Sequence, residues 1–207
     1  MSKQKQSIRK EMRKVLRSLD HRWVKAASQQ ICANVCGLLD SELGDRVQHV
    51  LAWTSFFDGE PDLSGCIIEQ LSRRQVYLPR TSENGSMDYI SLGDDWISQI
   101  EPGQFGIPEP RFSAGNLFQT DDAPRAVVLI PGLAFGLDGN RVGRGKGYYD
   151  RFLANKSLAG LIKVGVCWSL QVREEVPSES FDVTIDWICH ERGVERVSNS
   201  GSAEDFE

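Results

Sequence analysis

Residues 126–135 read AVVLIPGLAF, and residues 139–151 read GNRVGRGKGYYDR. The first stretch is an almost uninterrupted apolar run, which is typical of a strand buried on both faces of a parallel sheet. The second alternates glycine with cations and leads into a helix that we expect from about Gly147 to Ala154. A strand, a glycine-rich loop and a helix in this order predict an α/β fold with a ligand-binding loop after a core strand.

Strands and helices alternate on either side of this stretch. We expect an amphipathic helix around residues 8–19, a helix over 21–39 with Asp20 as its N-cap, a helix over 63–71, strands at 49–56, 76–78, 163–168 and 183–189, and an Asn84-Gly85 hairpin turn leading to 88–92. The loop-rich residues 93–124 are expected to cover a site. We therefore predict one domain over residues 1–197, a mostly parallel sheet with helices on both faces in a Rossmann-like three-layer arrangement, and a disordered tail over 198–207.

Charge is unevenly distributed along the chain. The formal net charge is −5, yet the first 25 residues hold nine Lys or Arg against two acidic residues. The overall charge argues against general nucleic-acid binding, and no apolar run is long enough to span a membrane. The five cysteines show no CxxC spacing, which favours free thiols in a reducing cytoplasm over disulfides or zinc. The basic start also resembles a mitochondrial presequence, an alternative that we weigh below cytoplasmic placement.

The N-terminal helix offers a use for its cations. Its apolar stripe runs through Ile8, Met12 and Leu16, and a row formed by Lys5, Arg9 and Arg13 follows one flank of that stripe. These three cations should sit where the helix meets the rest of the protein. Lys10, Lys14 and Arg17 are expected to point to the opposite side, as solvated charges.

The glycine-rich loop has the composition of an anion site. Glycines let backbone N–H groups approach a phosphate, the following helix adds partial positive charge, and Arg144 and Lys146 supply full charges. It is neither a Walker A loop, which needs Ser or Thr at Gly147, nor a dinucleotide fingerprint, which needs glycine at Tyr148. The alternative is a flexible surface turn with solvated charges.

Carboxylates near such a loop are candidates for Mg²⁺, which commonly takes one or two protein ligands beside phosphates. Asp150 lies in the helix after the loop, and Asp186 lies in the predicted strand over residues 183–189. Asp186 could instead be an outward-facing strand residue, and Asp182 is the alternative carboxylate to Asp186. Glu60 follows the strand over 49–56, and a lone carboxylate there would ordinarily be a first-turn charge favoured by the dipole of the next helix. The dispersed histidines offer no triad with a GxSxG serine, so nucleophilic catalysis has no support.

Several blocks together resemble the 5-formyltetrahydrofolate cyclo-ligase family. They are, in order, residues 5–9 with Arg13, Glu60 after a strand, 78–80, 105–110, 131–135 with Gly139, 141–151, and 176–177 before Asp182 and Asp186. The resemblance covers about residues 5–190. It implies an Mg- and ATP-dependent ligase of one-carbon metabolism that converts 5-formyltetrahydrofolate to 5,10-methenyltetrahydrofolate, releasing ADP and phosphate.

The resemblance also implies site residues. ATP would be bound by Lys5, Arg9, Arg13, Arg141, Val142, Gly143, Arg144, Gly145, Lys146, Gly147, Tyr148 and Tyr149. The folate would be bound by Ser55, Glu60, Arg144, Gly145, Lys146, Gly147 and Tyr148, with Arg144, Lys146 and Tyr148 as catalytic residues and Asp150 and Asp186 as metal ligands. We expect a monomeric cytoplasmic enzyme with no nucleic-acid or membrane partner. The rivals are an inactive relative that binds nucleic acid or protein, and an ATP-dependent enzyme for another formylated small molecule.

Overall fold

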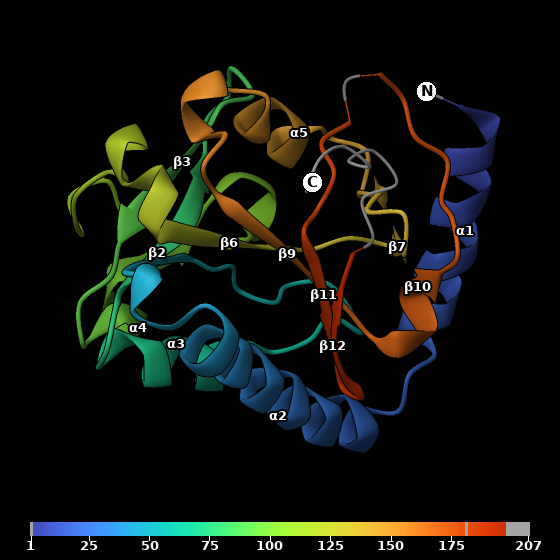
Figure 1. Cartoon of the computed structure of the whole chain (residues 1–207), viewed down its shortest axis with the longest axis horizontal. Helices are drawn as coiled ribbons and strands as arrows, with labels where there is room; N and C mark the ends of the chain where they lie inside the picture. The colour runs from blue at the N-terminus through green and yellow to red at the C-terminus, as the bar shows by residue number, and fades with distance from the viewer. Residues whose placement is uncertain (1, 181, 198–207) are drawn as a thin grey trace, which may run out of the picture.

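The computed structural model describes residues 2–180 and 182–197, and its centre is a seven-stranded sheet (Figure 1). The strands in spatial order are β12 (Gly193–Arg196), β11 (Trp187–His190), β9 (Ile162–Val166), β6 (Ala126–Ile130), β1 (His49–Leu51), β2 (Gln75–Thr81) and β3 (Met87–Ser91). The five inner strands are parallel, and the two edge strands are antiparallel to their neighbours. The predicted α/β class is therefore confirmed.

Each face of the sheet carries its own apolar core, because successive side chains of a strand point to opposite faces. Val50, Val127 and Leu129 face α1 (Lys3–Arg17), α2 (His21–Gly37) and α3 (Ser64–Leu71). Leu51 and Val128 instead face the side of α5 (Tyr148–Leu153). Figure 1 shows α2 and α3 below the sheet and α5 above it. The three-layer arrangement leaves the strand ends as the place for a site.

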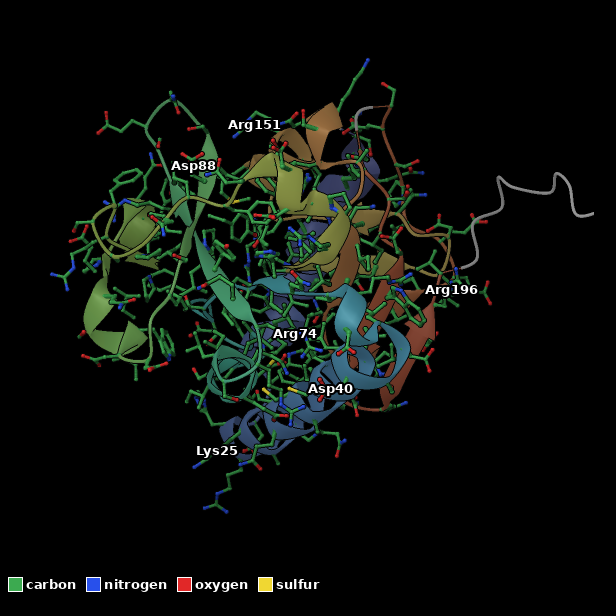
Figure 2. The ribbon with its side chains drawn as sticks, turned by 60° about the vertical axis from the view of Figure 1, so that its left-hand side comes forward. Lys25, Asp40, Arg74, Asp88, Arg151 and Arg196 are labelled. Atoms are coloured by element: carbon green, nitrogen blue, oxygen red, sulfur yellow. The ribbon has the colours of Figure 1, made fainter. Side chains whose placement is uncertain are left out.

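The predicted N-cap of the second helix and the predicted hairpin turn are both present in the structure. The Asp20 side chain accepts hydrogen bonds from the backbone N–H groups of Arg22 and Trp23, which caps α2. Gly85 has a φ of +85° in the turn between β2 and β3. Arg151 reaches from α5 and donates to the Gly85 carbonyl, and Figure 2 shows it beside the strand that carries Asp88. Among the described residues, no helix is long and apolar enough to cross a membrane.

The strand expected over residues 126–135 is wrong in extent, because it divides at Pro131. Proline has no N–H to donate to a ladder, and β6 ends at Ile130. Ala134–Gly136 forms β7 of a separate three-stranded sheet with β8 (Arg141–Val142) and β10 (Val172–Arg173). The strand expected over 49–56 is also shorter and ends at Leu51. Both strands are therefore followed by loops that begin at the carboxyl ends of the parallel strands.

The residues expected to be loop-rich, 93–124, contain short regular elements. These are α4 (Trp96–Gln99), β4 (Ile100–Pro102), β5 (Pro108–Pro110) and 3-10 turns at Gln104–Gly106 and Thr120–Arg125. The antiparallel pair β4 and β5 makes a hairpin, residues 100–110, that we call the flap. The flap lies against the carboxyl end of β2, where Arg80 donates to the Pro110 carbonyl at 2.8 Å. The predicted tail over residues 198–207 lies outside the described residues.

Candidate active site

The order in which the chain adds strands to the sheet reverses beside β1. From β1 the chain crosses to β2 on one side, whereas β6 and then β9 lie on the other side. In parallel α/β sheets, ligands bind outside the carboxyl ends of strands at such a switch point. A cavity of about 510 Å³ opens there, between the loops that follow β1, β6 and β8 and beneath the flap.

The cavity has a cationic part and an apolar part. The cationic part is formed by Arg9, Arg13 and Arg17 of α1 together with Arg141 and residues 143–147. The apolar part is formed by Trp53, Phe56, Phe57, Pro79, Met87, Phe105 and Ile107. This division suits a ligand set that combines phosphate groups with a flat ring.

The glycine-rich loop, residues 143–147, connects β8 to α5. Gly145 and Gly147 have φ values of +100° and +71°, a region that glycine adopts without the strain of a Cβ. A Cβ on Gly147 would lie 2.8 Å from the Arg151 Nη1 atom, which donates to the Lys146 carbonyl. The loop conformation therefore depends on glycine at these two positions, and both glycines line the cavity.

Arg144 is held on two sides within the cavity. Its Nε donates to Glu60 Oε1 at 3.0 Å, and its Nη2 donates to the same oxygen. The guanidinium carbon lies 3.9 Å from the centre of the Phe57 ring, a cation–π contact. With 24% of its side chain exposed, Arg144 keeps one edge toward the cavity. The arrangement presents a fixed positive charge to a ligand.

Glu60 is largely engaged by the protein itself. Its Oε2 accepts hydrogen bonds from the backbone N–H groups of Phe56 and Phe57, each at 3.0 Å, while Oε1 faces Arg144. Only 10% of the side chain is exposed. These contacts tie the loop after β1 to the glycine-rich loop, so Glu60 fixes the position of Arg144.

The N-terminal helix reaches the same loop. Arg9 Nε donates to the Gly143 carbonyl at 2.9 Å, and Arg13 Nη2 donates to the Arg144 carbonyl at 3.0 Å. Both side chains line the cavity. Two cations of the predicted row thus sit beside the loop although they lie about 130 residues away in sequence.

Lys146 of the glycine-rich loop and the first two residues of α5, Tyr148 and Tyr149, complete this wall. Tyr148 donates from its hydroxyl to Gln104 Oε1 of the flap at 2.8 Å, and the Lys146 ammonium lies 5.1 Å from the Phe105 ring centre. Burial raises the pKa of the Tyr149 hydroxyl above its ordinary value. The flap and the glycine-rich loop are therefore joined across the cavity.

A model of the 5-formyltetrahydrofolate cyclo-ligase family matches residues 1–191. The chain belongs to this family. A 5-formyltetrahydrofolate cyclo-ligase from Haemophilus influenzae is 28% identical over 185 residues, covering 89% of this chain and 96% of that protein. The Saccharomyces cerevisiae protein of the same name is 28% identical, covering 89% of this chain and 93% of that protein. The solved 5,10-methenyltetrahydrofolate synthetase of Aquifex aeolicus aligns with a TM-score of 0.78 at 29% identity, covering 97% of this chain and 96% of that one.

The cyclo-ligase resemblance expected from the sequence is thus confirmed, and these matched relatives are named as enzymes. The structure also brings most of the expected site residues to one cavity. Arg9, Arg13, Glu60, Arg141, Gly143, Arg144, Gly145, Lys146, Gly147, Tyr148, Tyr149 and Asp150 all line it. Val142 is fully buried in β8 and contributes no lining side chain, and Ser55 does not line the cavity although its neighbours Thr54 and Phe56 do.

Lys5 stands apart from the other cations of α1. It is 2% exposed and forms ion pairs with Glu179, at 3.3 Å, and with Asp182. On a helical wheel Lys5 falls between Met12 and Leu16, inside the apolar stripe, so its side chain points into the protein. In the structure, Lys5 does not line the cavity that Arg9 lines, contrary to the expectation that both face the same ligand.

Arg17 also departs from expectation, in the opposite sense. It was expected to be a solvated charge, yet it lines the cavity one helical turn beyond Arg13. Gly59, in the loop after β1, packs so closely on Leu16 that an added Cβ would lie 2.2 Å from the Leu16 carbonyl oxygen. Because the long side chain of Arg17 lines the cavity, the cavity extends to the last residue of α1.

The two predicted metal ligands lie at different places. Asp150 lines the cavity and pairs with Arg141, whereas Asp186 precedes β11 at the amino end of the parallel strands. Asp186 accepts from the Lys163 backbone N–H at 2.7 Å and pairs with the Lys163 ammonium at 3.1 Å. Asp182, the alternative, pairs with Lys5. The prediction of one metal site containing Asp150 and Asp186 needs correction, because Asp150 lines the cavity whereas Asp186 is bonded to Lys163 and does not line it.

Glu109 is a cavity residue that our sequence reasoning did not assign to the site. It lies in β5 and is 2% exposed, and its carboxylate accepts hydrogen bonds from Thr81. Burial raises the pKa of this carboxyl, although hydrogen bonds from Thr81 oppose that shift. The block over residues 105–110 was part of the family resemblance, but nothing in its composition indicates which side chain turns inward.

Proposed function

We propose that this chain is a 5-formyltetrahydrofolate cyclo-ligase, which uses ATP to close 5-formyltetrahydrofolate to 5,10-methenyltetrahydrofolate. The observation that carries the proposal is the cavity at the switch point, where a glycine-rich cationic loop faces an apolar wall. The loop suits the phosphates of ATP, and the apolar wall suits the folate ring. Names of the matched relatives support the same reaction.

The chemistry needs no side-chain nucleophile. The formyl oxygen attacks the γ-phosphorus as the bond to the ADP oxygen breaks, so the formyl oxygen becomes phosphorylated and its carbon is activated. N10 of the folate then attacks that carbon and loses its proton, and the bond from carbon to the phosphorylated oxygen breaks, which releases phosphate as the ring closes. Arg144 and Lys146 supply positive charge where phosphoryl oxygens gain negative charge, and Arg9 and Arg13 hold the loop and add charge beside it.

Mg²⁺ fits this site only together with the nucleotide. Among the described residues, no group of three or more His, Cys, Asp or Glu side chains is arranged to hold a metal ion. Asp150 is a single carboxylate at the cavity wall, 28% exposed, which matches the preference of Mg²⁺ for one or two carboxylates plus phosphate oxygens. We propose that Asp150 is the protein contact of a nucleotide-bound Mg²⁺. The ion would neutralise phosphate charge there.

The test is the ultraviolet absorbance of the methenyl chromophore. Purified protein is mixed with 5-formyltetrahydrofolate, Mg²⁺ and ATP, and the same mixture without ATP serves as the control. Chromophore formation that needs ATP is the expected result. A flat trace from folded protein that binds ATP would reject this substrate and favour another formylated compound.

Arg9→Ala should raise the KM for ATP about tenfold, with a smaller effect on kcat. Arg9 contacts the glycine-rich loop and lines the cavity, so its loss removes charge and loosens the loop. The measurement is the initial rate as a function of ATP concentration. Lys10→Ala is the matched control, because Lys10 is exposed on the outer side of the same helix. An unaltered ATP dependence in Arg9→Ala would count against nucleotide binding by α1.

Glu60→Gln should lower kcat about tenfold while the KM for the folate changes less than threefold. The amide can still accept from the N–H groups of Phe56 and Phe57, but it loses the charge that holds Arg144. Steady-state kinetics with the folate varied at saturating ATP separates the two parameters. A raised KM with an unchanged kcat would instead assign Glu60 to the polar edge of the folate.

We also propose a cytoplasmic, monomeric protein. The five cysteines are free in the structure, which suits a reducing compartment. Arg9 and Arg13 contact the glycine-rich loop, which favours a role in the cavity over a nucleic-acid surface. Size-exclusion chromatography with light scattering tests the monomer.

A further inference from the structure

Glu109 is a buried carboxylate that the reaction above does not use. It is 2% exposed, yet it lines the cavity from the flap. Its Oε1 accepts from the Thr81 hydroxyl at 2.7 Å, and its Oε2 accepts from the Thr81 backbone N–H at 3.2 Å. Thr81 is the last residue of β2, so this pair joins the flap to the main sheet.

Gly103 leaves the space that the Glu109 side chain occupies. A Cβ on Gly103 would lie 2.2 Å from the Glu109 Cδ atom, so the carboxylate occupies the space of a missing side chain. Two further bonds attach β5 nearby, from Thr54 Oγ1 to the Pro108 carbonyl at 3.0 Å and from Arg80 to the Pro110 carbonyl. Glu109 stands between them and attaches the flap to β2 together with Glu101, which pairs with Arg80.

The flap presents apolar side chains to the cavity. Phe105 has a φ of +68°, the only positive value among non-glycine residues in the described part of the chain, and its ring is half exposed. Phe105 and Ile107 line the cavity opposite the glycine-rich loop. A non-glycine residue in this backbone region is held by its surroundings at a cost in energy. The Glu109 attachment is well placed to hold it.

We propose that Glu109 is a positioning residue for the reduced folate: by bonding to both donors of Thr81 it fixes the flap so that Phe105 and Ile107 form the wall for the folate ring. This inference rests on the function proposed above. It assigns the flap to the folate part of the cavity and the glycine-rich loop to the nucleotide part.

The test compares binding of two ligands by calorimetry. Glu109→Ala should weaken binding of 5-formyltetrahydrofolate about tenfold and binding of ADP with Mg²⁺ less than about twofold. Glu109→Gln should stay within about threefold of the wild type for both ligands, because an amide can accept from the Thr81 N–H and donate to its hydroxyl. In kinetics, Glu109→Ala should raise the KM for the folate more than it lowers kcat.

Glu101→Gln is the matched control, since Glu101 lies opposite Glu109 in the same hairpin and pairs with Arg80 at 2.8 Å without lining the cavity. If Glu109→Ala does not fold, Thr81→Val decides, because it removes one of the two donors and should weaken folate binding about threefold. Unchanged folate binding in folded Glu109→Ala, or an equal loss of ADP binding, overturns this inference alone. A wild-type chain that binds ADP but no folate overturns it together with the proposed function.

Discussion

Arg144→Ala is expected to lower kcat by about 10²- to 10³-fold, because it removes a fixed charge from the place where phosphoryl oxygens become more negative. Glu60 and Phe57 already hold the guanidinium before any ligand binds, so little reorganisation is needed during the reaction. The Glu60 carboxylate would also lose its cationic partner while only 10% of its side chain is exposed. The measurement is the single-turnover rate of chromophore formation at saturating ATP and folate.

Arg173→Ala is the control for Arg144→Ala, since Arg173 forms an arginine–carboxylate pair with Glu11, at 2.8 Å, outside the cavity. It should keep its rate within about twofold of the wild type. Arg144→Lys should recover part of the lost rate, because an ammonium restores charge but not the planar contact with Phe57. A single-turnover rate in Arg144→Ala equal to the wild type would remove Arg144 from the catalytic residues.

Local signals in the sequence predicted the parts of the site that lie close together in the chain. The apolar run at residues 126–130, the glycines after it and the short helix at 148–153 are adjacent, and each has a composition that few other structures accept. The row of Arg9 and Arg13 also follows from helical spacing. These features specify their own conformation, so the strand, the loop and the helix could be placed before the structure was known.

The remaining differences concern side chains whose partners are distant in sequence. Lys5 forms ion pairs with Glu179 and Asp182, and Asp186 forms one with Lys163. These pairs form only because separate elements pack together. A carboxylate in an apolar stretch of sequence is compatible both with a metal ligand and with a paired charge, and the spacing of residues in the sequence cannot distinguish the two. Glu109 was missed for the same reason, because its inward direction depends on the pairing of β4 with β5 and on the space at Gly103.

Asp150→Ala is expected to abolish detectable turnover and also to lower the free energy of unfolding by about 3 kcal/mol. The first effect follows from the proposed Mg²⁺ contact. The second follows from Arg141, whose side chain is 4% exposed and whose charge would lose its carboxylate. Among the described residues the Arg141 Nε has no hydrogen-bond acceptor, so this atom offers no compensating bond when the carboxylate is removed. Urea unfolding and chromophore formation measure the two effects on the same samples.

The two roles of Asp150 can be separated with a double-mutant cycle. In an Arg141→Met background, Asp150→Ala should cost much less unfolding free energy, because no buried guanidinium remains to be left unpaired. Turnover should stay lost in that double variant if the carboxylate also contacts the nucleotide-bound Mg²⁺. If a stably folded Asp150→Asn keeps wild-type turnover and an unchanged dependence on Mg²⁺ concentration, the carboxylate charge is dispensable, and Asp150 serves only to hold Arg141. Because Arg141 itself lines the cavity, even that result would leave the pair as part of the site.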